Sequence, residues 1–374
     1  MNVGSLLKSG VAVAVLWAAT GTAFAVTCTY INKRGVVKGT MYVSAAITVG
    51  RDVPVGTEVF RQKFAVTPGG AAQIECDGGP FERTVEFELG SSYSQANWPS
   101  GTYANKVYNT EIKGLGVVFK AYKGLLPRRD VNPSICVEKR KCVADLDTIS
   151  DFEIIVIKIG DVVPGILSGR LLPTVRMFIN FGSVKMQGLE IDMSGGVQVL
   201  SGTCSTPNVP VRMGTHLVSN FTEPNSATAW TDFSIFLTNC PPFRGTVNQT
   251  PAIWVSEGGT DSGGSAGDNN GSYDNNRLQY RIDPVRTAIS PGTGVLSLEP
   301  TAAGKPSAAS GIGVQVATKD GAPLPLATLQ SSGLTLLDRA SSYSIPLRAR
   351  YLKTGNVVTG GAANASATFT ISYE

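Results

Sequence analysis

Six cysteines are the side chains in this 374-residue chain whose type and spacing most directly suggest chemistry. Their number is even, the chain has a single histidine (His216), and no Cys-x-x-Cys pair occurs. This pattern favours disulfides over a zinc site. Six cysteines allow fifteen connectivities. Their order and grouping along the chain favour the pairs Cys28–Cys76, Cys136–Cys142 and Cys204–Cys240.

Catalysis has little support in the remaining residue types. No phosphate-binding loop and no GxGxxG turn leading into a helix is present. Acidic residues gather between Asp145 and Glu153, and a carboxylate pair is the equipment of a glycoside hydrolase. A solvated loop explains that acidic group more simply. We therefore predict no catalytic residue, no cofactor and no metal, and we expect a protein that is not an enzyme.

Binding is better supported than catalysis. The segment 90–111 carries aromatic and amide side chains among small turn residues. Aromatic rings supply apolar area and polar groups fix orientation in a shallow sugar site. The candidate ligand-binding residues are Tyr93, Asn97, Trp98, Tyr103 and Tyr108. The alternative is that these aromatic side chains fill the core or close one end of the fold.

The charge distribution indicates a binding partner less clearly than the aromatic segment does. The stretch from Lys120 to Lys141 is basic and could attract an anionic surface or an acidic glycan, although a solvated basic loop is the default explanation. The formal net charge of the whole chain is only +4. That excess is too small to predict a nucleic-acid partner.

The elements that carry these residues are predicted to be strands. Apolar residues alternate with polar ones in many short runs bounded by Gly, Pro and Asn, which is typical of an all-β protein. The β-branched run 153–159 predicts a central buried strand. The segment 256–276 is rich in Gly, Ser, Asp and Asn and predicts a flexible loop. Its aspartates match no dedicated calcium loop.

Three segments are predicted along the chain. Residues 1–25 have a basic start at Lys8, an apolar run and an Ala-Phe-Ala site, which indicate a secretory signal peptide. Two cysteine pairs of similar placement then indicate two tandem β-sandwiches. The polar, Gly-rich stretch 192–196 predicts the boundary between them. The modules are therefore expected at 26–195 and 196–374.

The end of the chain has the clearest strand pattern. Ile345, Leu347 and Ala349 share one face of an extended segment, and a second run alternates through Phe369 and Ile371. Nothing after Glu374 remains in this sequence to cover the edge of that last strand. An open edge with an apolar face is an aggregation hazard unless another strand pairs with it. A central position in a sheet is one solution, and a strand borrowed from another chain is the other.

Four blocks of sequence resemble the pilin subunits of chaperone–usher fimbriae of the type-1 kind. They are GTCSTPNVPVRMG at 202–214, FSIFLTNCP at 233–241, GIGVQVATKDGAPLPL at 311–326, and the ending just described. The resemblance implies an incomplete immunoglobulin-like sandwich that a donated strand completes, first from a periplasmic chaperone and then from the adjacent pilin subunit. It also implies that Phe369, Ile371 and Tyr373 face the groove and that the carboxylate of Glu374 anchors in the chaperone.

A two-module chain of this kind resembles a fimbrial tip adhesin. The expected N-terminal module is a jelly-roll or immunoglobulin-like lectin-type domain that binds a host or surface receptor, either a glycan or a protein. With the signal peptide removed, the chain would begin at Val26 without an extension to donate, as expected of a tip subunit. The implied route runs through the periplasm and an outer-membrane usher to a fimbrium at the cell surface. The alternatives are a structural or assembly-initiating subunit without a receptor, and a secreted carbohydrate-active enzyme.

Overall fold

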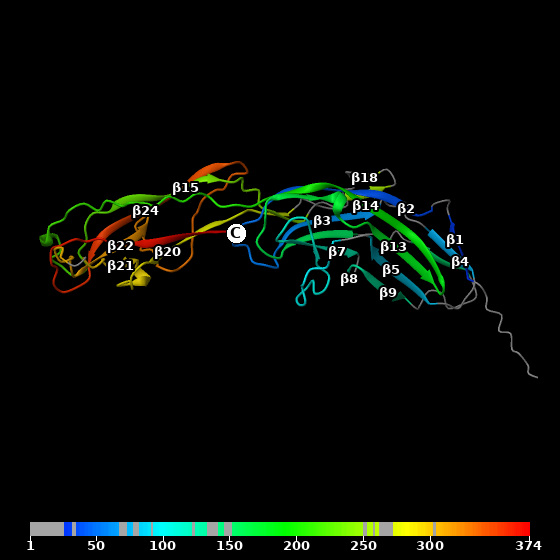
Figure 1. Ribbon diagram of the computed structural model, residues 1–374, viewed down its shortest axis with the longest axis horizontal. Coiled ribbons are helices and arrows are strands. Elements are labelled where there is room, and N and C mark those ends of the chain that lie inside the picture. Colours follow the sequence, from blue (N-terminus) through cyan, green and yellow to red (C-terminus); the bar gives the residue numbers. More distant parts are fainter. Residues whose placement is uncertain are drawn as a thin grey trace, which may run out of the picture.

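The computed structural model describes residues 26–31, 35–66, 73–77, 82–90, 93–121, 124–132, 141–145, 152–249, 253–256, 259–261, 272–301 and 304–374. The regular secondary structure of the described chain is almost entirely strand, with short 3-10 turns as its helical elements, so the all-β prediction is confirmed. Figure 1 shows two elongated lobes joined end to end. We call them the N-terminal lobe, whose own strands end at Leu200, and the C-terminal lobe.

Two large sheets face each other in the N-terminal lobe. The first has the order β12 (Gly165–Ser168), β14 (Val184–Leu200), β13 (Val175–Phe181), β5 (Arg83–Leu89) and β9 (Arg128–Asn132), with β2 (Val37–Thr48) parallel to β14. The second contains β3 (Glu58–Val66), β11 (Phe152–Lys158), β7 (Leu115–Ala121) and β6 (Tyr108–Asn109), with β8 (Gly124–Leu125) against β7.

The facing side chains of these sheets form one apolar core. Phe60 and Phe64 of β3 meet Phe87 of β5 and Phe181 of β13, and all four are fully buried. The β-branched run predicted to be a central strand is β11, which lies between β3 and β7. That prediction is confirmed, because a strand with neighbours on both sides and cover on both faces needs apolar residues throughout.

A small third sheet closes the far end of this lobe. It consists of β1 (Thr27–Ile31), β4 (Gln73–Asp77) and β10 (Cys142–Asp145). Cys28 and Cys76 face each other across β1 and β4 and form a disulfide, as predicted. Cys142 is also disulfide-bonded, and its expected partner Cys136 lies outside the described residues.

The C-terminal lobe has two smaller sheets. The first has the order β15 (Thr231–Cys240), β24 (Ser341–Lys353), β22 (Ile312–Thr318) and β21 (Val295–Leu296). The second has the order β23 (Gln330–Ser331), β20 (Leu278–Pro284) and β25 (Ala367–Tyr373). The predicted disulfide Cys204–Cys240 is present.

The predicted break at 192–196 is not a break. These residues lie within β14, which stays paired with β2 as far as Leu200 and Thr48. Gly195 is needed for close packing, since a Cβ there would collide with the carbonyl of Val43 and the ring of Tyr42. The prediction fails here because a pair of glycines in the sequence does not distinguish a turn from a close approach within a sheet.

The connection between β15 and β20 crosses to the other lobe. Its strands are β16 (Thr246–Gln249), β17 (Ile253–Ser256), β18 (Gly259–Asp261) and β19 (Ser272–Asp274). Both β16 and β17 pair in parallel with β3, and Val247 is buried in the core of the N-terminal lobe. The prediction of a loop throughout 256–276 was therefore wrong for β18 and β19. Residues 257–258 and 262–271 lie outside the described part of the chain.

Candidate functional site: an open groove along the last strand

The C-terminal lobe has a groove of about 650 Å³ between its two sheets. One rim is the extended segment 208–214, and the other is formed by 363–367 together with Phe369 of β25. The floor consists of apolar side chains from both sheets. They are Phe233 and Ile235 of β15, Ile282 of β20, Leu296 of β21, Val314 and Val316 of β22, and Ala349 and Tyr351 of β24.

Alternating side chains build the first rim. Val209, Val211 and Met213 are partly buried, whereas the residues between them are exposed. This is the period-two pattern of a strand with one face on a core. Among the described residues, however, no main-chain hydrogen bond joins 206–216 to another segment. The rim is therefore extended like a strand but has no hydrogen-bonded partner strand in the part of the chain that the structure describes.

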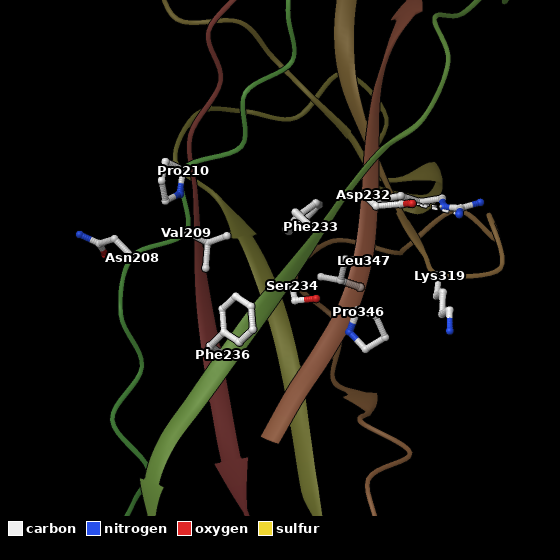
Figure 2. Close-up of a pocket in the computed structure, with 11 residues that line it drawn as sticks. Asn208, Val209, Pro210, Asp232, Phe233, Ser234, Phe236, Lys319, Pro346 and Leu347 are labelled. Atoms are coloured by element: carbon white, nitrogen blue, oxygen red, sulfur yellow. Dashed lines mark hydrogen bonds and ion pairs between the residues drawn. The ribbon is translucent and has the colours of Figure 1, made fainter. Parts of the chain in front are cut away.

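Figure 2 shows the adjoining pocket, where the rim passes β15. Val209 lies on one side of this pocket, and Pro346 and Leu347 of β24 lie on the other. Phe236 is beside it and is 53% exposed, a large fraction for an aromatic ring on a strand. The apolar lining of the groove therefore continues onto the outer surface of β15.

The second rim is an edge strand. In its sheet β25 is the last strand, with β20 as its partner, among the described residues. Arg277 and Glu374 exchange both of their main-chain hydrogen bonds, at 2.7 and 3.0 Å. Antiparallel pairs alternate between bonded and non-bonded. The main-chain groups of Phe369, Ile371 and Tyr373 therefore point away from β20, toward the open edge.

The predicted groove residues do not all lie in the groove. Phe369 lines it, and Ile371 is partly buried against the core of the same lobe. Tyr373 is buried at the junction of the lobes, where its hydroxyl accepts a hydrogen bond from Cys204 N at 2.9 Å and its ring stacks on Phe243. Burial raises the pKa of Tyr373.

The terminal residue also lies at the junction. The main chain of Glu374 bonds to Arg277, and Asn276 donates to it at 3.5 Å. The sequence pattern predicted β25 as a groove strand but did not predict the opposite rim, segment 208–214. The alternation of Val209, Val211 and Met213 was visible in the sequence and was the available signal.

The candidate ligand-binding residues of the N-terminal lobe are dispersed. Trp98 and Tyr103 pack on a small apolar cluster on the outer face of the second sheet, with Val107, Val118 and Ile155. The Tyr103 hydroxyl donates to Glu58, which also pairs with Arg61 at 2.8 Å. Burial, followed by the hydrogen bond to Glu58, raises the pKa of Tyr103 to about 12.

The other three candidates lie elsewhere. Tyr93 and Tyr108 pack against the main core, and Asn97 is exposed. The Tyr93 hydroxyl donates to Glu111, and burial together with this carboxylate raises the pKa of Tyr93 well above its ordinary value. The structure thus brings Trp98 and Tyr103 together but distributes the five side chains over two apolar surfaces and solvent.

Three basic side chains of the Lys120–Lys141 stretch have acidic partners, and Arg129 is exposed. Lys120 pairs with Glu153 at 3.4 Å, and Lys141 pairs with Glu75 at 2.7 Å. Arg128 pairs with Asp130 and lies over the ring of Phe87. The residues Lys123, Lys139 and Arg140 lie outside the described part. These pairs fit the alternative of a solvated basic surface.

Glu153 of the acidic group and His216 are also engaged, whereas Asp147 and Asp151 lie outside the described residues. Glu153 lies between Arg61, at 2.5 Å, and Lys120. His216 packs edge-on against Tyr351, and its Nε2 is 2.8 Å from the carbonyl of Met213. Among the described residues, no group of three metal-ligating side chains occurs, and no helix has the length and apolar character needed to cross a membrane.

Residues 191–374 match the family model described as Fimbrial protein. An 89-residue stretch is 44% identical to the type-1 fimbrial protein, A chain, of Escherichia coli (strain K12). A stretch of the same length is 44% identical to the fimbrial subunit type 1 of Klebsiella pneumoniae. Each match covers 24% of this chain and 46% of the relative, so it spans about half the length of these curated proteins.

Two solved structures are also similar. The CupB6 tip adhesin from Pseudomonas aeruginosa is 14% identical, with a TM-score of 0.34 over 92% of this chain and 93% of that one. The receptor binding domain of the adhesin MrkD1P of Klebsiella pneumoniae is 17% identical, with a TM-score of 0.35 over 48% of this chain and 99% of that one. The family match thus identifies a fimbrial protein domain in residues 191–374 of this chain.

Proposed function

We propose that this chain is a fimbrial tip adhesin whose C-terminal lobe is completed by a strand from another protein. The observation that supports this most directly is the open edge of β25 beside an apolar groove. Main-chain hydrogen bonds along such an edge provide affinity, and alternate apolar side chains that fill the groove provide specificity. An extended segment lying between Val211 and Phe369 would satisfy both requirements.

The proposed partners follow from that mechanism. A periplasmic chaperone supplies the first strand, and the adjacent pilin subunit replaces it during assembly at an outer-membrane usher. The finished chain is part of a fimbrium at the cell surface. The carboxylate of Glu374 is the proposed anchor for the chaperone, and capture then requires that it leave its contacts with Arg277 and Asn276.

The acceptor is tested by paired substitutions on β25. Phe369→Asp places a charge in the groove, whereas Thr370→Asp places the same charge on the exposed opposite face. We expect the first to weaken capture by the chaperone at least about tenfold, because an unpaired charge in an apolar groove costs more than about 1.4 kcal/mol. Thr370→Asp should leave capture by the chaperone nearly unchanged. Deleting 367–374 should abolish capture, and normal co-purification of that truncated chain with the chaperone would contradict the proposal.

The N-terminal lobe is the proposed receptor-binding part, and its ligand is a host or surface glycan or protein. It has its own core and an aromatic segment, 93–109, that covers the outer face of one sheet. Each single site is expected to bind modestly, with many fimbriae supplying avidity. The test is a glycan and matrix-protein array probed with the full chain. Loss of a saturable signal in Trp98→Ala, with the fold retained, would support this segment.

A structural or assembly-initiating subunit is the second candidate. The packing of Trp98 and Tyr103 on Val107, Val118 and Ile155 favours it, because side chains committed to a cluster are less available to a ligand. A folded chain that completes its groove normally and gives no signal on the array would support this candidate and contradict the adhesin.

A further inference from the structure

The end of β25 that lies at the junction is already paired, and its partner comes from the N-terminal lobe. Asp52 lies in the loop between β2 and β3. Its main-chain N–H donates to the carbonyl of Tyr373 at 3.0 Å, and its side-chain Oδ2 accepts from the N–H of Tyr373 at 2.9 Å. These are the two groups that Tyr373 directs toward the open edge, so Asp52 occupies the position of a neighbouring strand residue.

The loop that carries Asp52 is firmly held. Lys158 at the end of β11 donates from Nζ to the carbonyls of Gly50, at 3.1 Å, and Arg51, at 2.5 Å. The Lys158 side chain is buried, and burial lowers its pKa. Gly50 lies so close to Tyr373 that a Cβ on it would collide with the Tyr373 carbonyl. The loop and the strand end therefore fit each other closely.

We propose that this loop, residues 49–53, is a built-in stop at one end of the strand acceptor. The inference rests on the proposed function, since it concerns the same open edge. A donated strand pairs with the free main-chain groups of Phe369 and Ile371 and ends where Asp52 begins. The partner segment that fits is extended and apolar at alternate positions. It carries no carboxylate at the end that meets Asp52, because like charges repel there.

The carboxylate has a specific role in this stop. Tyr373 is only 4% exposed, so water cannot readily replace Asp52 as the acceptor of its N–H. A buried donor without an acceptor is costly, which keeps Asp52 in place unless another strand offers a carbonyl. Removing the carboxylate should therefore free the Tyr373 N–H and extend the acceptor by one position.

The test is residue-resolved amide hydrogen exchange of the full chain, with and without a short synthetic peptide in which valine and threonine alternate. Without peptide, the amide of Tyr373 should be protected and those of Phe369 and Ile371 should exchange rapidly. Peptide should protect Phe369 and Ile371 and leave Tyr373 unchanged. In Asp52→Ala without peptide, Tyr373 should exchange about tenfold faster, because a charge-assisted hydrogen bond is lost. In this variant, added peptide should then protect the amide of Tyr373.

Two variants serve as matched controls. Asp52→Asn retains an acceptor oxygen and should restore most of the protection of Tyr373, whereas Arg51→Ala alters an exposed side chain of the same loop and should change nothing. Equal Tyr373 exchange in the wild type and Asp52→Ala, or loss of Tyr373 protection when peptide binds the wild type, would overturn the stop alone. A peptide that protects neither Phe369 nor Ile371 would overturn the proposed acceptor itself.

Discussion

Two sheet edges of this molecule differ in whether another segment covers them. The edge of β3 in the N-terminal lobe is covered by β16 and β17, which come from the C-terminal part of the chain. Among the described residues, the edge of β25 in the C-terminal lobe is covered only at Tyr373, by Asp52 of the N-terminal lobe. Each lobe thus covers an edge of the other, one over several residues and the other at a single position.

The two cores reflect this difference. Phe60 and Phe64 beside the covered edge are fully buried, whereas Val314 and Tyr351 on the floor of the groove remain 7% exposed. A covered edge permits a sealed core, and an uncovered edge leaves part of the apolar floor accessible to solvent. The comparison teaches that the incompleteness of this protein is local. The apolar groove beside β25 is open, whereas β16 and β17 cover the edge of β3.

The largest expected effect comes from uncovering the edge of β3. Val247→Asp places a charge in the core of the N-terminal lobe, where Val247 is 3% exposed. We expect the free energy of unfolding to fall by at least about 3 kcal/mol, because the buried carboxylate has no partner. Denaturant unfolding provides the measurement. Val285→Asp is the matched control, since Val285 is 62% exposed and should tolerate the same change. Equal effects of the two substitutions would contradict a functional cover on β3.

A smaller effect is expected from disturbing the single covered position of β25. Gly50→Ala introduces a methyl group against the Tyr373 carbonyl, and main-chain atoms on both sides leave little room to relax. We expect a loss of about 2 kcal/mol in unfolding free energy, in the range typical of overpacking, together with faster amide exchange at Tyr373. Gly35→Ala, where a Cβ meets nothing within 4 Å, is the control. Unchanged exchange at Tyr373 would mean that the loop and the strand separate readily.

The smallest effect concerns the outer face of the covered sheet. Tyr103 ordinarily would titrate at about 10, and its pKa is raised to about 12 in the fold. The folded state therefore holds this proton more tightly than the unfolded state. The resulting stability is complete below pH about 10 and is lost as the pH rises toward about 12. Since Tyr103 is partly exposed, we expect no more than about 1 kcal/mol after solvent screening.

Tyr103→Phe should remove that alkaline component. Unfolding free energies measured from neutral to alkaline pH should decline less steeply in the variant than in the wild type. The alkaline phenolate absorbance should also lose one late-titrating component, the one that titrates toward pH about 12. If the unfolding free energies of the two proteins decline in parallel as the pH rises, the contact between Tyr103 and Glu58 does not contribute to the stability of this face.

Local patterns in the sequence were enough for much of the fold. The alternation around Ile345 and Phe369 predicted β24 and β25, and the β-branched run predicted β11. The path of Val247 into the other lobe could not be predicted, because no local pattern specifies which distant edge a short strand joins. The role of Asp52 was hidden for the same reason. Its partner Tyr373 is separated from it by 321 positions, and an aspartate in a turn most often bonds to the main chain of its own turn.

The crossing of the β15–β20 connection also determines how the molecule carries load. The chain passes between the lobes after Leu200, again before Thr246, and once more after Asp274. A force that separates the lobes is therefore distributed over several chain segments that connect them. The pairing of β16 and β17 with β3 must also break before one lobe can rotate freely. A single proteolytic cut in any one passage would leave the lobes joined. In the proposed tip adhesin, which a fibre would hold at one end and a surface at the other, such a joint transmits tension without acting as a simple hinge.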